Sequence, residues 1–167
     1  KVLIVDLDEE RCQEVADEIG DSASPFAADV TDEEQVKAYV EACVETFGGV
    51  DILFDNAGIE GAVAPLLQQE REDFQKVLNV NLLGAWMGIK HAAPKIAERG
   101  GGSIVVTSSV AGLIGSAGLG PYVSSKHAVL GLVKTAAQEL AEMNIRVNAV
   151  NPGPIDNRMM DSIQDQA

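Results

Sequence analysis

The chain has 167 residues, and 46% of them are hydrophobic, which is enough to build the core of one domain. Its 12 Lys and Arg residues are outnumbered by 26 Asp and Glu residues, so the formal net charge is −14. This negative charge argues against nucleic acid or an anionic membrane surface as a partner. No apolar run reaches the roughly 18 residues of a membrane span, and the first residues lack the pattern of a signal peptide.

The expected elements alternate along the chain between short apolar runs and helical patterns. The expected strands cover residues 1–6, 25–30, 50–55, 103–108 and 145–150. The expected helices cover residues 9–19, 31–47, 71–99 and 122–143. Strands that alternate with helices predict right-handed βαβ units, and therefore an α/β fold with a doubly wound, mostly parallel sheet in three αβα layers. We expect residues 1–167 to form a single domain.

Local signals place some of the helix ends. Asp8 is expected to cap the first helix and Gly20 to stop it, and residues 31–34 open the second helix with a capping-box pattern. Cys12 and Cys43 are the only cysteines, and each falls in an expected helix. Two such thiols indicate ordinary packing residues rather than a disulfide or a metal site, and a reducing, cytoplasmic setting.

Polar residues gather where the expected strands end. These residues are Asp6, Asp29, Asp55 to Gly58, Ser108 with Ser109, and Asn151 to Gly153. Any one of them could simply form a turn, because Asn, Asp, Gly and Ser favour turns for local reasons. Their occurrence along one rim indicates a ligand site, since doubly wound sheets bind ligands at the carboxyl ends of their strands.

Tyr122 and Lys126 stand four residues apart in the expected helix and therefore share a face. A neighbouring ammonium group favours the phenolate and should lower the pKa of Tyr122 from its free value of about 10. Such a tyrosine can act as a general acid or base near neutral pH. The spacing alone is weak support, because this pair also arises by chance.

Asn81 is unusual because it falls on an apolar face of the helix expected over residues 71–99. The rest of that face is Phe74, Leu78, Ala85, Gly88 and Ala92. An unsatisfied amide there would cost about 1–3 kcal/mol, so we expect its side chain to be hydrogen-bonded. Two roles stay open: holding the helix backbone open, and holding a water molecule in a proton path.

Taken together, these motifs resemble those of the short-chain dehydrogenase/reductase family, in its single-domain, Rossmann-like form. The matching residues are Asn56-Ala57-Gly58, Asn81 within Asn79–Gly84, Ser109, Tyr122-x-x-x-Lys126 and Pro152-Gly153. The thirteen residues from Ser109 to Tyr122 select Ser109 over Ser108 for the family's serine.

The resemblance implies an oxidoreductase that interconverts a secondary alcohol and a ketone (EC 1.1.1.-) with a nicotinamide cofactor. Tyr122 would exchange a proton with the substrate oxygen, which Ser109 would hold. Lys126 would lower the pKa of Tyr122 and bind the nicotinamide ribose. Asn81 would keep a water molecule that links Lys126 to solvent. The partners implied are a small-molecule alcohol or ketone and further copies of the chain, as a homotetramer or homodimer.

The resemblance also implies a cofactor site along the rim. Asp6 would accept hydrogen bonds from the adenosine 2′-hydroxyl and repel a 2′-phosphate, and the first arginine after it is Arg11. NAD is therefore favoured over NADP. The other residues expected along the cofactor are Asp29, Val30, Asn56, Ala57, Gly58, Pro152, Gly153 and Ile155.

The chain departs from the family pattern in three places. The family begins with a strand and a Thr-Gly-x-x-x-Gly-x-Gly turn, and this chain has neither and ends before the family's last helices and strand. We therefore expect a window on a chain of roughly 250 residues. A central strand would then be missing, and the 167 residues alone should neither fold stably nor bind NAD. Asp55 replaces a usual asparagine, and Asn157 a common threonine.

Two alternative functions stay open. The first is a catalytically silent, cofactor-binding relative, against which the intact Ser109, Tyr122, Lys126 and Asn81 argue. The second is an epimerase or dehydratase of the family's extended branch, which also uses a Tyr-x-x-x-Lys pair. The Asn-Ala-Gly motif and the compact spacing favour the simple oxidoreductase. No residue pattern indicates a metal site.

Overall fold

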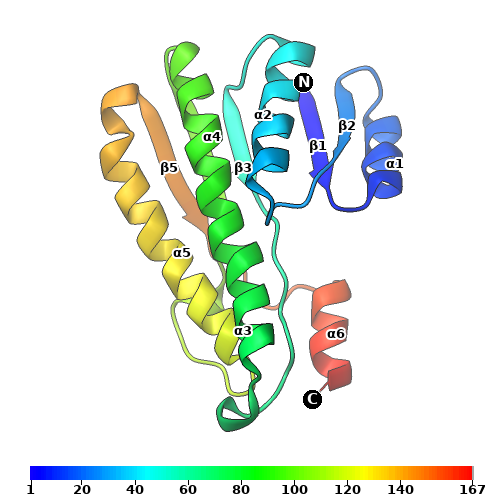
Figure 1. Cartoon of the computed structure of the whole chain (residues 1–167), viewed down its shortest axis with the longest axis vertical. Helices are drawn as coiled ribbons and strands as arrows, with labels where there is room; N and C mark the ends of the chain where they lie inside the picture. The colour runs from blue at the N-terminus through cyan, green and yellow to red at the C-terminus, as the bar shows by residue number, and fades with distance from the viewer. Residues whose placement is uncertain (167) are drawn as a thin grey trace.

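The structure is a computed structural model that describes residues 1–166, and its strands form two parallel sheets (Figure 1). In the first sheet, β1 (Val2–Asp6) pairs with β2 (Ala23–Ala27). The second sheet has the order β3–β4–β5, built from Ile52–Asp55, Gly102–Thr107 and Ile145–Val150. Every strand pair is parallel, as the alternation of strands and helices predicted.

The five strands form two separate hydrogen-bonded sheets rather than one continuous sheet. Among residues 1–166, β1 pairs only with β2 and β3 only with β4, and each keeps one open edge. This agrees with the expectation, drawn from the family resemblance, that the neighbours of an absent central strand have unpaired backbone groups. The α/β class with parallel strands is confirmed.

The helices cover the sheets as right-handed crossovers require. They are α1 (Glu9–Ile19), α2 (Glu33–Phe47), α3 (Arg71–Leu78), α4 (Ala85–Glu98), α5 (Gly120–Glu139) and α6 (Arg158–Gln166). The chain moves outward from β1 to β2 and back toward β3, so α1 lies on one face and α2, α4 and α5 lie on the other. Figure 1 shows α4 and α5 side by side over the second sheet.

Local chemistry explains most helix boundaries. The Asp8 carboxylate accepts the N–H of Arg11 and caps α1, as expected. Asp32, rather than Thr31, caps α2 by accepting the N–H groups of Glu34 and Gln35. In α5 a proline stands in the first turn, where its missing N–H costs nothing.

Other boundaries differ from the prediction. Strand β2 covers residues 23–27 rather than 25–30, because Asp29 bonds to Thr31 in a turn. The helix expected over residues 71–99 is continuous but contains a π-helical turn, Asn79–Gly84. Short 3-10 turns cover Leu66–Gln68, Val110–Gly112 and Ala141–Met143. Helix α6 was not predicted, and the side chain of Gln166 ties its end to the N–H of Val63.

The main core lies between α4, α5 and the second sheet. Ile96, Ile104 and Val129 from these three elements are fully buried. On the opposite face of β3, Ile52 and Phe54 are 67% and 61% exposed. Parallel strands are normally covered on both faces, and this face is bare in the described part of the chain. Within residues 1–166, no helix has the length and apolar character needed to cross a membrane.

Candidate active site

Tyr122 and Lys126 lie at the start of α5, where both are buried, with 9% and 3% of their surfaces exposed. The Lys126 ammonium lies 5.6 Å from the centre of the Tyr122 ring. Its Nζ donates a hydrogen bond of 2.7 Å to the backbone oxygen of Thr107, the last residue of β4. The pair predicted from sequence therefore shares a buried face at the carboxyl end of β4.

Ser109 follows β4 in extended backbone and caps the 3-10 turn Val110–Gly112, with its Oγ accepting the Ala111 N–H at 3.1 Å. Burial raises the pKa of Tyr122, a hydrogen bond with Ser109 lowers it, and the charge of Glu60 raises it further, so the net shift is upward. Lys126, which was expected to lower the pKa of Tyr122, is not among these contributions. The ammonium lies over the ring and bonds to Thr107, away from the phenol oxygen.

Ser108 has a separate structural role. Its side chain is 1% exposed, and its Oγ donates to the backbone oxygen of Lys126 at 3.0 Å. A side chain at Gly112 would come within 2.6 Å of that hydroxyl, so the turn needs glycine to pack here. Ser108 thus joins β4 to α5, while Ser109 is the serine that contacts Tyr122.

Asn81 lies in the π-helical turn with only 2% of its surface exposed, and its side chain is fully hydrogen-bonded. Its Nδ2 donates to the oxygen of Ile59 at 2.9 Å and to the Oγ of Ser125 at 3.0 Å, and its Oδ1 accepts the Ile59 N–H at 2.8 Å. The Ser125 hydroxyl donates in turn to the backbone oxygen of Tyr122 at 2.8 Å. Asn81 therefore connects the loop after β3 to the helix that carries Tyr122.

The sequence did not reveal three residues of this network. The oxygen of Thr107 and both backbone groups of Ile59 have no signature in the sequence, because every residue carries such groups. Ser125 is 0% exposed and lies three residues after Tyr122, on the face that meets the π-helical turn. A buried serine at that spacing is the one signal that was available.

Asp55, at the end of β3, is the charged residue that interacts with Lys126. Burial lowers the pKa of Lys126 to about 8, and the Asp55 charge acts against this shift. Burial likewise raises the pKa of Asp55 to about 6, and the Lys126 charge acts against that shift. Desolvation outweighs the mutual attraction for both groups.

The residues expected near the adenosine lie at the ends of β1 and β2. Asp6 ends β1, with its Oδ1 accepting the N–H of Asp8 at 3.1 Å, and it is exposed. Asp29 accepts both the N–H and the hydroxyl of Thr31, so its carboxylate already serves a turn. Val30 packs against Gly84 of the π-helical turn, where a Cβ would lie 3.0 Å from its Cγ2.

The Asn56–Gly58 loop passes between β3 and Lys126. Asn56 accepts a hydrogen bond of 2.8 Å from the Thr107 hydroxyl, and both Asn56 and Ala57 are exposed. A Cβ at Gly58 would lie 3.4 Å from the Lys126 Nζ and 3.4 Å from Asn81 Oδ1, so the loop lies directly on the predicted catalytic groups.

The segment after β5 lies beside Ser109, because Pro152 accepts the N–H of Val110 at 2.9 Å. Gly153 and Ile155 are exposed. A cavity of about 490 Å³ lies between the loop after β3 and α6, with Gly58, Glu60 and Asn157 among its lining residues. The structure thus brings both the Asn56–Gly58 loop and the Pro152–Ile155 segment to the rim that holds Tyr122, leaving exposed groups and space beside them for a cofactor.

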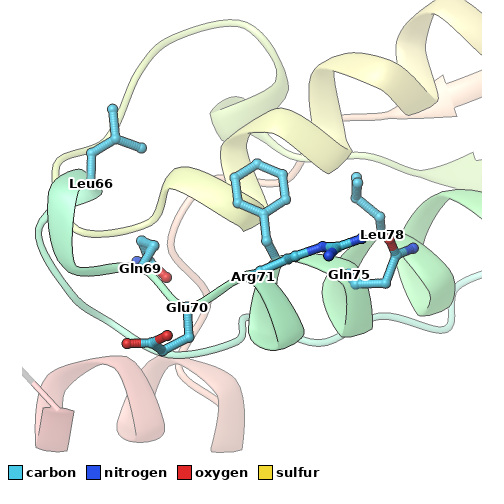
Figure 2. A pocket seen from close by; sticks show the side chains of 7 residues that line it. Leu66, Gln69, Glu70, Arg71, Gln75 and Leu78 are labelled. Carbon is cyan, nitrogen blue, oxygen red and sulfur yellow. The ribbon is translucent and has the colours of Figure 1, made fainter.

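A second hollow, of about 330 Å³, lies on the outer side of α3 (Figure 2). It is lined by Leu66 and Gln69, from the segment between β3 and α3, and by residues of α3. Figure 2 shows the Arg71 side chain extended along α3 toward Gln75 and Leu78. None of the residues predicted for catalysis or cofactor binding lines it.

The family model for short chain dehydrogenase matches residues 1–167. The chain belongs to the short-chain dehydrogenase family. It is 47% identical to short-chain dehydrogenase reductase 3a of Arabidopsis thaliana, over 91% of this chain and 60% of that protein. It is 41% identical to cyclohexanol dehydrogenase of Acinetobacter sp. (strain SE19), over 92% of this chain and 62% of that protein.

Solved structures of this family share the fold. The 3-ketoacyl-(acyl-carrier-protein) reductase from Brucella melitensis, complexed with NADH, matches with a TM-score of 0.95 and 34% identity, over 99% of this chain and 70% of that chain. The chain spans about 60% of the length of the curated relatives named above.

Proposed function

We propose that this protein is an NAD-dependent oxidoreductase that interconverts a secondary alcohol and a ketone, with Tyr122 as general acid and base. The observation that carries the proposal is the buried Tyr122, which has Ser109 at its hydroxyl and Lys126 over its ring. A buried phenol with one hydroxyl neighbour and one cationic neighbour is suited to proton exchange with a substrate oxygen.

The chain's own residues divide the proton chemistry among them. When bound, the nicotinamide cofactor would accept or supply the hydride. The Ser109 hydroxyl would hold the substrate oxygen close to the Tyr122 hydroxyl, so that the phenol gives a proton to a ketone or takes one from an alcohol. The charge of Lys126 does not contribute to the Tyr122 pKa in this structure, and we propose that it favours the Tyr122 phenolate once substrate and cofactor are bound.

Lys126 has donors to spare for the ribose. An ammonium group has three N–H donors, and one of them is used by the Thr107 oxygen at 2.7 Å. Gly58 lies next to the same Nζ without a side chain to cover it. A ribose hydroxyl that approaches over the Asn56–Gly58 loop would therefore find a free donor.

For the cofactor we propose NAD rather than NADP. Asp6 is exposed at the end of β1, and Asp8 uses only its Oδ1. A free carboxylate oxygen there can accept from the 2′-hydroxyl of adenosine and would repel a 2′-phosphate. Parallel titrations with NADH and NADPH, followed by cofactor fluorescence, test this choice, and tighter binding of NADPH would contradict it.

For the substrate we propose a small, uncharged secondary alcohol or ketone. Leu113 and Ile114 follow the Ser109 turn and are 61% and 58% exposed, which provides apolar surface beside the proposed catalytic groups. Cyclohexanol dehydrogenase, the Acinetobacter relative, has a name that describes such a substrate.

The activity test is a panel of secondary alcohols with NAD, in which the formation of NADH is followed by its absorbance. Tyr122→Phe removes only the proposed proton donor and should abolish turnover while cofactor binding remains. The assays use the full-length protein. Activity that survives in Tyr122→Phe, or no NADH with any alcohol, would contradict the proposal and favour a silent relative or an epimerase.

The proposed oligomer is a homotetramer or homodimer in the cytoplasm, with residues 1–167 acting as one domain. Leu83 and Trp86, near the start of α4, are each 42% exposed, and a partner chain could cover them. Cys12 and Cys43 are free, as a reducing compartment would leave them. Light scattering in solution checks the oligomer, and a monomeric mass would contradict it.

A further inference from the structure

Asp55 is a half-buried acidic residue to which the proposed mechanism assigns no role. It ends β3 directly before the Asn56–Gly58 loop, and its side chain shares a face with Leu53, which packs against the core. In the described part of the chain, its Oδ2 is buried and has no hydrogen-bond partner. An unpaired buried carboxylate is costly, so its presence here needs an explanation.

The space for the Asp55 carboxylate depends on Gly88 of α4. A Cβ at Gly88 would lie 2.9 Å from the Asp55 Oδ2 and 3.2 Å from the hydroxyl of Tyr39 in α2. Only glycine therefore leaves room for the carboxylate and the phenol together. Burial raises the pKa of Tyr39, and the charge of Asp55 raises it further, so the phenol stays neutral beside the acid.

Two ionisable groups face Asp55 from the elements packed against it. They are Tyr39 from α2 and Lys126 from α5, while α4 contributes Gly88 and no charge. Asp55 is the register partner of Val106 in β4, and the Lys126 Nζ bonds to the oxygen of the next residue, Thr107. The carboxylate at the end of β3 therefore lies at the same end of the sheet as the ammonium, which α5 brings to the end of the neighbouring strand β4.

Their interaction is electrostatic rather than a direct contact. Lys126 takes part in none of the ion pairs formed within residues 1–166. Each of the two groups nevertheless favours the charged form of the other. Because both are buried, solvent screens this attraction less than it would screen a surface pair.

On the basis of the function proposed above, we propose that Asp55 is a positioning residue for Lys126: its carboxylate keeps the ammonium protonated at neutral and mildly alkaline pH. Loss of that negative charge would let Lys126 lose its proton at lower pH. Lys126 would then stop favouring the Tyr122 phenolate at a lower pH than in the unsubstituted protein.

The test is a direct titration of Lys126 in protein labelled with ¹³C and ¹⁵N lysine, in which its Nζ and Cε shifts are followed by NMR. In Asp55→Asn the midpoint of Lys126 should fall by about one pH unit, the lower end of the effect of a nearby charge. Asp51→Asn is the control, because Asp51 is exposed at the other end of the strand and pairs with Arg99. An unchanged midpoint in Asp55→Asn would overturn the proposal.

The unsubstituted protein provides a second readout that needs no variant to fold. The carboxyl ¹³C shift of Asp55 should titrate well above the range of ordinary aspartates, and the Lys126 Nζ shift should respond in that same pH range. A Lys126 shift that stays constant while Asp55 titrates would overturn the coupling.

Activity measurements separate this inference from the proposed function. In Asp55→Asn the alkaline limb of kcat/KM should move to lower pH, and in Asp51→Asn it should not move. If no alcohol is oxidised but the Lys126 midpoint shifts, the proposed function fails and the coupling stands. If Tyr122-dependent activity is present but the Lys126 midpoint does not shift, the coupling fails and the function stands.

Discussion

Replacing Asp55 with asparagine should make the folded protein more stable, and the gain should grow with pH. Burial raises the pKa of this carboxyl from 3.8 to about 6, so the folded state binds its proton more tightly than the unfolded state does. The unsubstituted protein therefore loses stability as pH rises through that window. The asparagine side chain of the Asp55→Asn variant cannot ionise and avoids this loss.

The size of the effect follows from the shift. A shift of about 2 pH units corresponds to about 3 kcal/mol of unfolding free energy once Asp55 is fully ionised. The advantage of Asp55→Asn should be about 1.5 kcal/mol at about pH 5 and about 3 kcal/mol at about pH 7.5. This range stays above the isoelectric point near 4.3, where the protein is least soluble.

The assay is urea denaturation of both proteins at these two pH values, followed by circular dichroism. The difference between the two proteins cancels the titration of all other groups they share. Asp51→Asn is the control for the loss of one carboxylate, because Asp51 is exposed and stands directly before β3. A difference for Asp55→Asn that is independent of pH, or a less stable Asp55→Asn at about pH 7.5, would refute the reasoning.

Three further substitutions test the site. Asn81→Ala removes a side chain with three hydrogen bonds and should lower the unfolding free energy by about 3 kcal/mol in urea denaturation. Gly88→Ala places a methyl group 2.9 Å from the Asp55 Oδ2 and should lower the unfolding free energy by about 1–3 kcal/mol. Gly131→Ala in α5 is its control, because the added methyl group would meet no atom within 4 Å, and it should raise the unfolding free energy by up to about 1 kcal/mol. Ser109→Ala should lower kcat/KM by about a hundredfold without a matching fall in stability. Equal stability of the two alanine-for-glycine variants, or unchanged kinetics in Ser109→Ala, would contradict these expectations.

The coupling of Lys126 to Asp55 changes how the proposed site is understood. From the helix spacing alone, Lys126 was expected to act on Tyr122. In this structure the charged residue that acts on Lys126 is Asp55, and the pKa of Tyr122 is set by burial, Ser109 and Glu60. The proton chemistry that we propose for the site therefore involves β3 as well as α5.

Local patterns in the sequence determined much of this protein. The periodicity of residues 9–19 and 145–150 predicted α1 and β5 with the observed bounds, because helix and strand periods depend on neighbouring residues only. The four-residue spacing placed Tyr122 and Lys126 on one buried face of α5. The apolar stripe around Asn81 predicted a buried and hydrogen-bonded amide, which the structure confirms.

Only the tertiary structure decided which groups meet. The backbone oxygen of Thr107 and both backbone groups of Ile59 bind predicted site residues, and every residue offers such groups, so no sequence pattern marks them. The ionisation of Asp55 and Lys126 depends on burial and on the distance between charges, which are set by packing. The sequence predicted the residues of the site, and the packing of β3 against α2, α4 and α5 set their charges.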